Sequence, residues 1–218
     1  MNSLTVLMHL LEDPQGLVPP GSLPTLEAFI NGYLNGMATL GSPLRERSEE
    51  LELWDSYRRH VQGGTSFCGS VYQCFYRSGY DDKEAWQNMR RDLRGFLSKE
   101  ATMEALGSSE NLGFCRKEFE ALMHALIKEP HMYLGTSSLL LLVQFLNGLI
   151  YAVKLHSQDP FVEEHFSRFE EWLQATDNAP SKMRWDRLLA IKAGYNEIFA
   201  MEKFCEFYKE FLKGEKIQ

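Results

Sequence analysis

Apolar residues recur along this chain at the spacing of α-helices, and no stretch sustains the alternation that marks a half-buried strand. The clearest stripes are Leu4, Leu7, Met8 and Leu11, then Phe119, Leu122, Met123, Leu126 and Ile127, and finally Ile198, Met201, Phe204, Cys205, Tyr208, Phe211 and Leu212. Further helices are expected to end at about Leu40 and Leu155, and to lie near 44–62, 66–77, 82–99, 160–175, 181–193 and 195–213. We therefore predict an all-α, mainly helical fold.

Two prolines mark where the first and middle stripes stop. Pro14 and Pro130 should end the preceding helix, because the residue before a proline is pushed out of the helical region. Short extended pieces, "GLVPPG" and "HMYLGT", are expected to follow them. Ser22 and Ser138 are candidate N-caps for the next helices.

The chain repeats itself at a long interval. Pro130 follows Pro14 by 116 positions, and Phe145 follows Phe29 by the same 116. Six more pairs are identical at this shift, namely Leu10 with Leu126, Ser22 with Ser138, Leu23 with Leu139, Leu26 with Leu142, Asn31 with Asn147 and Gly32 with Gly148. At a shift of 115, Gly79, Tyr80 and Phe96 match Gly194, Tyr195 and Phe211.

This period is too long for a solenoid. It predicts a tandem duplication of a roughly five-helix unit of about 100 residues with pseudo-two-fold symmetry, residues 1–100 forming the first repeat and 101–218 the second, packed as one compact body. Gly32 and Gly148 stand inside predicted helices, so we expect them to admit a closely approaching backbone, with Asn31 and Asn147 hydrogen-bonding across that contact. Pro14, Pro130 and these Asn-Gly pairs are thus expected to be structural, and a ligand contact is the alternative for the Asn-Gly pairs.

Charge narrows the possible partners. The chain has 30 acidic and 23 basic residues and a net charge of -7. It lacks the basic footprint that nucleic acids or anionic membranes require, and an acidic protein suits a basic protein partner. The alternative is that the charge only keeps the protein soluble.

Three features of the sequence bear on where in the cell the protein is located. The N-terminus lacks a basic region and a cleavage site, so we predict no signal peptide. Leu139–Val153 is apolar, but it is too short and too polar to span a bilayer, which favours a core helix. The four cysteines, Cys68, Cys74, Cys115 and Cys205, form no CxxC pair and favour free thiols in the cytoplasm.

Catalytic and metal-binding signals are weak. The six histidines form no zinc motif, and no GxSxG, P-loop or GxGxxG sequence occurs. His165 lies among carboxylates, where a solvated charged face is favoured over a metal site, and Asp81 and Asp82 are interpreted as helix-start charges. We therefore predict no catalytic residue, metal or cofactor, with an enzyme of unrecognised site as a lesser alternative.

Two acidic segments with aromatic residues are candidate binding surfaces. "RERSEELELWDSY" combines Glu49, Glu50 and Glu52 with Trp54 and Tyr57. "DPFVEEHFSRFEEW" brings Glu163 and Glu164 near aromatic residues in the second repeat. Carboxylates beside aromatic anchors suit a basic partner, whereas the alternative places Trp54 in the core of a solvated helix.

The stretch from Pro130 to Gly148, P-H-M-Y-L-G-T followed by a helix with F-x-x-G, resembles a motif of bacterial polymorphic-toxin immunity proteins. Its twin at Pro14–Gly32 lacks Met-Tyr-Leu-Gly, so the repeats are expected to have diverged, one to scaffold and one to bind. The resemblance implies a cytosolic, non-catalytic protein that binds and occludes a co-inherited toxin, and it carries over no binding residue. Tyr133 is a separate candidate for a contact with the partner. A helical adaptor of another kind is the alternative, and the sequence leaves the oligomeric state open.

Overall fold

The computed structural model describes residues 3–14, 16–19, 21–40, 44–62, 75, 81–100, 113–177, 179–180 and 182–215, without the side chains of 44–51, 62, 99–100 and 215. These residues form ten helices and no strand, which confirms the all-α fold. The helices are α1 (Ser3–Glu12), α2 (Leu23–Ala38), α3 (Leu44–Gln62), α5 (Asp82–Glu100), α6 (Arg116–Lys128), α7 (Pro130–Leu134), α8 (Leu139–His156), α9 (Phe161–Asp177), α10 (Trp185–Lys192) and α11 (Glu197–Glu215). Apart from Phe75, the helix expected near 66–77 lies outside the described residues.

The segment after α6 differs from the expected extended piece. Pro130 begins the short helix α7, because a proline ring fixes φ near the helical value and the first turn needs no N–H from that residue. Gly135 ends α7 in the left-handed conformation, with φ 72°, and its N–H donates to the carbonyl of His131 at 3.0 Å. The prediction for "HMYLGT" was wrong because this glycine cap stabilises one helical turn before α8.

The two serine caps differ from each other. The Ser138 hydroxyl accepts a hydrogen bond from the N–H of Leu141 at 3.4 Å, as an N-cap does. Ser22 occupies the corresponding position before α2, but its side chain makes no capping bond. Its backbone carbonyl instead accepts from the hydroxyl of Thr25 at 2.8 Å.

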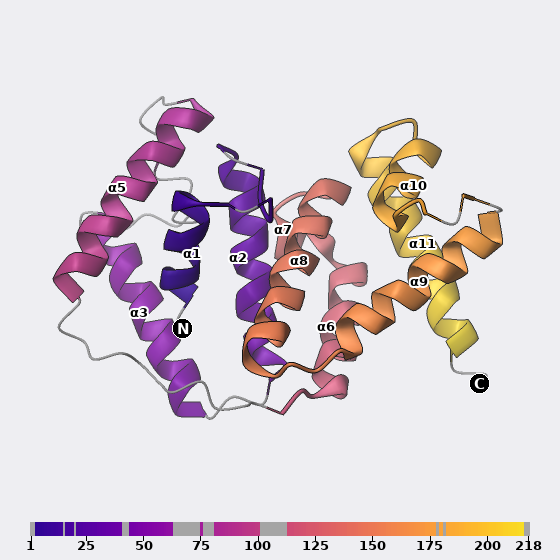
Figure 1. Ribbon diagram of the computed structural model, residues 1–218, viewed down its shortest axis with the longest axis horizontal. Coiled ribbons are helices and arrows are strands. Elements are labelled where there is room, and N and C mark those ends of the chain that lie inside the picture. The colour runs from indigo at the N-terminus through magenta and orange to yellow at the C-terminus, as the bar shows by residue number, and fades with distance from the viewer. Residues whose placement is uncertain are drawn as a thin grey trace.

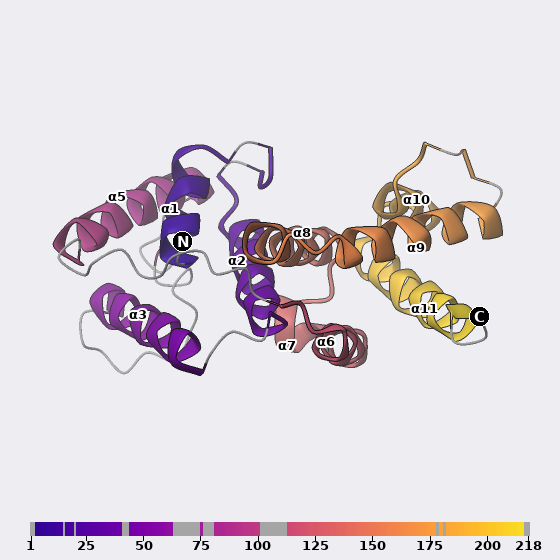
Figure 2. The same ribbon diagram turned by 60° about the horizontal axis from the view of Figure 1, so that its bottom comes forward.

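Helices α2 and α8 lie side by side at the centre of the molecule (Figures 1 and 2). On one side of this pair lie α1, α3 and α5, and on the other lie α9, α10 and α11. The two chain ends are therefore on opposite sides of the central pair. Each side builds its own apolar core against one flank of the pair.

The central helices touch backbone to backbone at two glycines. A Cβ atom on Gly32 would lie 1.8 Å from the carbonyl oxygen of Phe145, and one on Gly148 would lie 1.9 Å from the carbonyl oxygen of Phe29. Both distances are far inside van der Waals contact, so any side chain here would force the helices apart. Asn31 and Asn147, expected to bond across this contact, make no such bond among the described residues, where the glycine contact is direct.

The close approach lets each half contribute to the other's core. Ala28 and Leu40 from the first half are buried in the cluster built mainly by the second half, while Ala152 is buried in the cluster built by the first. The buried Tyr33 hydroxyl and His156 Nε2 lie 2.8 Å apart and join α2 to the end of α8. The two halves are therefore coupled by both apolar and polar contacts.

Among the described helices, α8 alone has the length and apolar composition needed to cross a membrane. In this structure 67% of that stretch is buried within the protein, against α2 and the second core. Its hydrophobicity is thus used in packing here.

We expect Gly32→Ala and Gly148→Ala each to lower the free energy of unfolding by roughly 3 kcal/mol or more, because the added methyl must separate two backbones. Urea unfolding followed by circular dichroism measures the loss. Gly95→Ala is the matched control: it is also a helical glycine, but open space surrounds it, so a gain of about 0.5–1 kcal/mol is expected. Equal midpoints for all three variants would contradict the backbone contact.

Candidate functional site

The acidic segment of α3 offers fewer aromatic contacts than its sequence indicates. Tyr57 is fully buried in the first core and does not reach the surface. Trp54 is half-buried, and its indole N–H donates to the hydroxyl of Ser3 on α1. Glu52 is exposed, while the side chains of Glu49 and Glu50 lie outside the described residues. The aromatic residues of this segment therefore serve mainly to pack α3.

The acidic segment of α9 divides between surface and core. Glu163 and Glu164 are exposed, and Glu163 pairs with Lys154 of α8 at 2.7 Å. His165 was expected on the same solvated face, but it is only 4% exposed. One residue further along a helix turns the side chain by about 100°, which is enough to carry it into the core. Tyr133 of α7 is half-buried against the ring of Phe145.

His165 lies in an aromatic cage. Its Nε2 is 2.6 Å from the hydroxyl of Tyr208, and five rings surround the imidazole, those of Phe119, Phe161, Phe166, Tyr208 and Phe211. Burial, and to a smaller extent the positive charge of Arg168, lower the pKa of His165 from 6.5 to about 4. The imidazole is therefore neutral at physiological pH and belongs to the core.

A different surface stands out by its exposed apolar side chains. Among the described residues, six large hydrophobic side chains are exposed, and all six belong to the second half of the chain. They are Met132, Leu140, Ile191, Tyr195, Ile198 and Phe199, here called the apolar surface. Tyr195 is 74% exposed and Phe199 57%, although aromatic rings gain most from burial. Where such side chains adjoin one another, they mark interaction sites in soluble proteins.

Four of the six residues, from Ile191 to Phe199, lie in or beside the connection from α10 to α11, and hydrogen bonds attach the start of α11 to α8. The Glu197 carboxylate accepts from the hydroxyl of Ser138 at 2.9 Å and from the N–H of Leu140 at 2.8 Å. Asn196 caps α11, since its side-chain oxygen accepts from the N–H of Ile198 and of Phe199, both at 3.1 Å. The start of α11 is thereby held against the start of α8.

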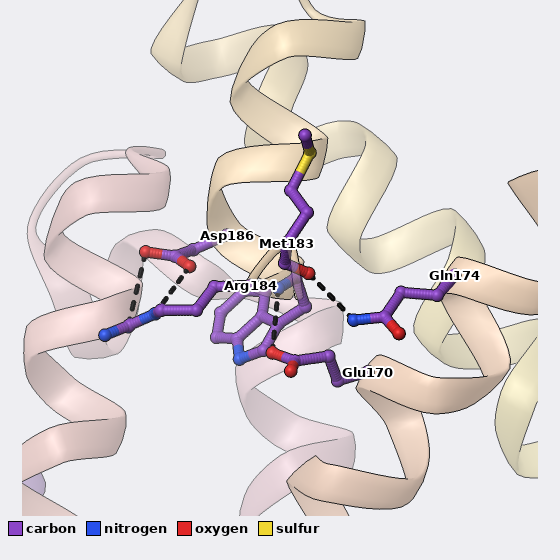
Figure 3. A network of polar contacts seen from close by, with 6 residues as sticks. Glu170, Gln174, Met183, Arg184 and Asp186 are labelled. Atoms are coloured by element: carbon purple, nitrogen blue, oxygen red, sulfur yellow. Dashed lines mark hydrogen bonds and ion pairs between the residues drawn. The ribbon is translucent and has the colours of Figure 1, made fainter. Parts of the chain in front are cut away.

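A second network holds α10 on α9 (Figure 3). The carboxylate of Glu170 accepts from the N–H of Trp185 at 3.0 Å, and the Gln174 amide donates to the carbonyl of Met183 at 2.9 Å. Arg184 pairs with Asp186 at 3.0 Å in the first turn of α10. Trp185 itself is buried in the second core. Both ends of the α10–α11 connection are thus positioned by packed and hydrogen-bonded elements.

Two hollows continue from the apolar surface along α11. One, of about 480 Å³, lies between α11 and the segment around α7, and it is lined by Pro130, Ser137, Ile198, Met201, Glu202, Cys205, Glu206, Lys209, Glu210 and Lys213. The other, of about 400 Å³, lies between α11 and the end of α6, and it is lined by His124, Ala125, Ile127, Lys128 and Lys209. Lys209 lines both hollows. Burial raises the pKa of the Cys205 thiol, so this residue of the first hollow is uncharged.

Sequence reasoning missed this surface because Ile198 fits the apolar stripe of α11, which predicts burial. In the structure Ile198 is 54% exposed, since the stripe spans more of the helix circumference than the core covers. The adjacent apolar pair at 198 and 199 was the available signal, because neighbouring helical positions point in different directions.

In the described part of the chain, no three His, Cys, Asp or Glu side chains lie close enough to hold a metal ion. Of the cysteines, Cys115 and Cys205 are described, and both are free.

Comparison of the chain with protein-family models, with curated proteins and with solved structures found no match.

We expect the protein to lose stability as the pH falls from about 6.5 toward 4. The unfolded chain binds a proton at His165 in that range while the folded protein does not, so protonation favours unfolding by up to about 3 kcal/mol. His165→Gln should reduce this loss, as measured by urea unfolding at a series of pH values. Tyr208→Phe, which keeps the buried imidazole, should retain it. An unchanged pH dependence in His165→Gln would contradict the assignment.

Proposed function

We propose that this chain is a non-catalytic protein-binding module and that its apolar surface contacts the partner. The observation that carries the proposal is the exposure of six large hydrophobic side chains on one half of the molecule. Tyr195 and Phe199 are exposed to water, so the free protein does not gain the favourable free energy of burying their rings. A bound partner that covers them gains it. The hydrogen bonds that Glu197 accepts from Ser138 and Leu140 hold the start of α11 in place before a partner binds. This order lowers the entropic cost of association.

The first half of the chain supports a specific role for this surface. At the shift of 115, Ile198 and Phe199 correspond to Lys83 and Glu84, both exposed at the start of α5. At the shift of 116, Leu140 corresponds to the exposed Pro24. These three positions are thus polar or small in the first half and apolar in the second, whereas Tyr195 corresponds to another tyrosine, Tyr80. This difference fits a division in which the first half scaffolds and the second half binds.

We also propose that the two halves arose by duplication and are related by a pseudo-two-fold axis. Asp82–Glu100 and Glu197–Glu215, the bounds of α5 and α11, are equally long and offset by 115 positions. Their caps correspond as well: Asp81 accepts from the N–H of Glu84 at 2.8 Å, as Asn196 does from the N–H of Phe199. A two-fold axis requires that contacts occur in reciprocal pairs.

The central glycines meet that requirement. Gly32 contacts the Phe145 carbonyl, and Gly148 contacts the Phe29 carbonyl, so adding or subtracting 116 converts one contact into the other. Reciprocal contacts of this kind are those of an isologous dimer interface. They support an ancestral unit that paired with its own copy before the two were joined.

In its more specific form, the proposal is that the module is a cytoplasmic immunity protein that occludes a co-inherited bacterial toxin. The support is the resemblance of Pro130–Gly148 to the motif of such proteins, and this stretch includes Met132 and Leu140 of the apolar surface. The net charge of -7 favours a basic toxin domain, because opposite charge accelerates encounter. Occlusion requires only a tight fit over the toxin's active site and no chemistry by this chain.

Co-expression with the product of the neighbouring gene tests the function. We expect a complex that purifies intact and suppresses the toxicity of that product. The double variant Tyr195→Asn, Phe199→Ser should weaken the complex roughly 10- to 100-fold, measured by calorimetry, because exposed aromatic anchors dominate such interfaces.

The matched control is Lys83→Ala, Glu84→Ala, which alters a corresponding start of α5 and should leave affinity unchanged. A neighbouring product that neither binds nor is toxic would contradict the immunity role. A complex indifferent to the Tyr195 and Phe199 changes would contradict the assigned surface.

The duplication predicts that the two helix caps are interchangeable. Asp81→Ala and Asn196→Ala should each lower the free energy of unfolding by about 1 kcal/mol, since each leaves an N–H of the first turn without its acceptor. Asp81→Asn and Asn196→Asp should keep nearly the parent stability. Urea unfolding measures all four, and a cost at only one of the two positions would contradict their equivalence.

A further inference from the structure

The six side chains of the apolar surface leave a large area in water. Their exposed fractions run from 42% for Ile191 to 74% for Tyr195 and average a little over one half. At about 200 Å² for a large side chain, this exposure amounts to roughly 700 Å². Each partner contributes about 800 Å² to a protein interface of standard size. These six side chains therefore supply most of the area that one side of a stable dimer needs.

Contacts among α8, α11 and the segment around α7 bring several of these side chains together. The Glu197 carboxylate accepts from the N–H of Leu140 at 2.8 Å, so Leu140 lies beside the start of α11, where Ile198 follows. Ile198 and Pro130 line the same hollow, and Met132 is two residues from Pro130 in α7. The exposed residues of these three helices thus adjoin one another.

Tyr195 has a backbone conformation that is unusual for its size. Its φ is 61°, in the left-handed region, and its N–H donates to the carbonyl of Ala190 at 2.7 Å where α10 ends. A large side chain makes this conformation unfavourable, whereas glycine adopts it readily. The free chain therefore bears the cost of a left-handed tyrosine whose ring remains in water. Burial of the ring at an interface offsets that cost.

The charges that flank the apolar surface are nearly balanced. From Arg187 to Lys203 the chain has three cationic and two anionic side chains, although the whole chain carries a net charge of -7. Lys192 pairs with Asp177 at 2.5 Å, and Lys203 pairs with Glu206 at 2.7 Å. A second copy of the same surface therefore meets this one without a large net repulsion.

A single surface of this kind limits the size of the assembly. All six exposed side chains of the described residues belong to the second half of the chain. A two-fold contact uses the same patch on both molecules, so it closes when two copies have met. An equivalent patch on the first half would instead have allowed the assembly to extend.

We infer that two copies of this chain pair through the apolar surface when no other partner is present, each burying its Tyr195 and Phe199 against the other. This inference rests on the proposed function, because it gives the same surface a second occupant. The second copy covers the apolar surface of the free protein. A different protein must displace that copy in order to bind.

Sedimentation velocity of the full-length protein between about 1 and 100 μM tests the pairing. We expect the mass of two copies at the upper concentrations. Tyr195→Asn, Phe199→Ser and Met132→Gln, Leu140→Gln change different helices of the same surface, and each should raise the dimer dissociation constant at least tenfold. All four residues are exposed, so unchanged circular dichroism spectra should confirm that both variants fold.

The control variant Lys83→Ala, Glu84→Ala should dimerise like the parent. A parent that is monomeric at about 100 μM would overturn the inference and leave the proposed function to its own test. Dimers that neither surface variant weakens would overturn it as well. So would assemblies that grow beyond two copies as the concentration rises.

The neighbouring gene product separates this inference from the proposed function. We expect it to split the dimer and to form a complex that contains one copy of each chain. A dimer that persists because the product does not bind retains the pairing and contradicts the immunity role. A product that binds the intact dimer retains the pairing and contradicts a surface shared by the two occupants.

Discussion

The rest of the structure depends on the contact between the backbones of α2 and α8. Helices separated by ordinary side chains have axes 8–10 Å apart, and glycine at the crossing allows a closer approach. Gly32 and Gly148 each face a carbonyl of the opposite helix, so neither position admits a side chain. The crossing helices are also the ones on which both cores are built, and their spacing therefore determines how each half packs.

Because the central pair is close-packed, the halves are not independent. Leu40 completes the second core and Ala152 the first, so separating the halves would expose apolar surface on both. The second half also contains an aromatic cluster around Phe169 and Tyr208. This cluster buries His165, and burial disfavours the charged form of its imidazole. This cluster packs α9, α10 and α11 against one another.

Hydrogen bonds hold the helices that carry the exposed apolar side chains. Glu170 and Gln174 hold the start of α10, and Glu197 joins the start of α11 to α8. The exposed side chains of Ile191 and Tyr195 lie between these two points of attachment. Their exposure is the observation on which the proposed binding role rests.

The sequence by itself determined the helical fold, most helix positions, the proline stops and the glycines at a close approach, because these follow from local periodicity and backbone geometry. It also contained the identical residues at shifts of 115 and 116 from which paired positions were compared. Only the tertiary structure decided which side of each apolar stripe is covered. Tyr57 and His165 became core residues and Ile198 a surface residue because burial depends on neighbouring helices, and a helical stripe does not specify how much of its width those neighbours cover.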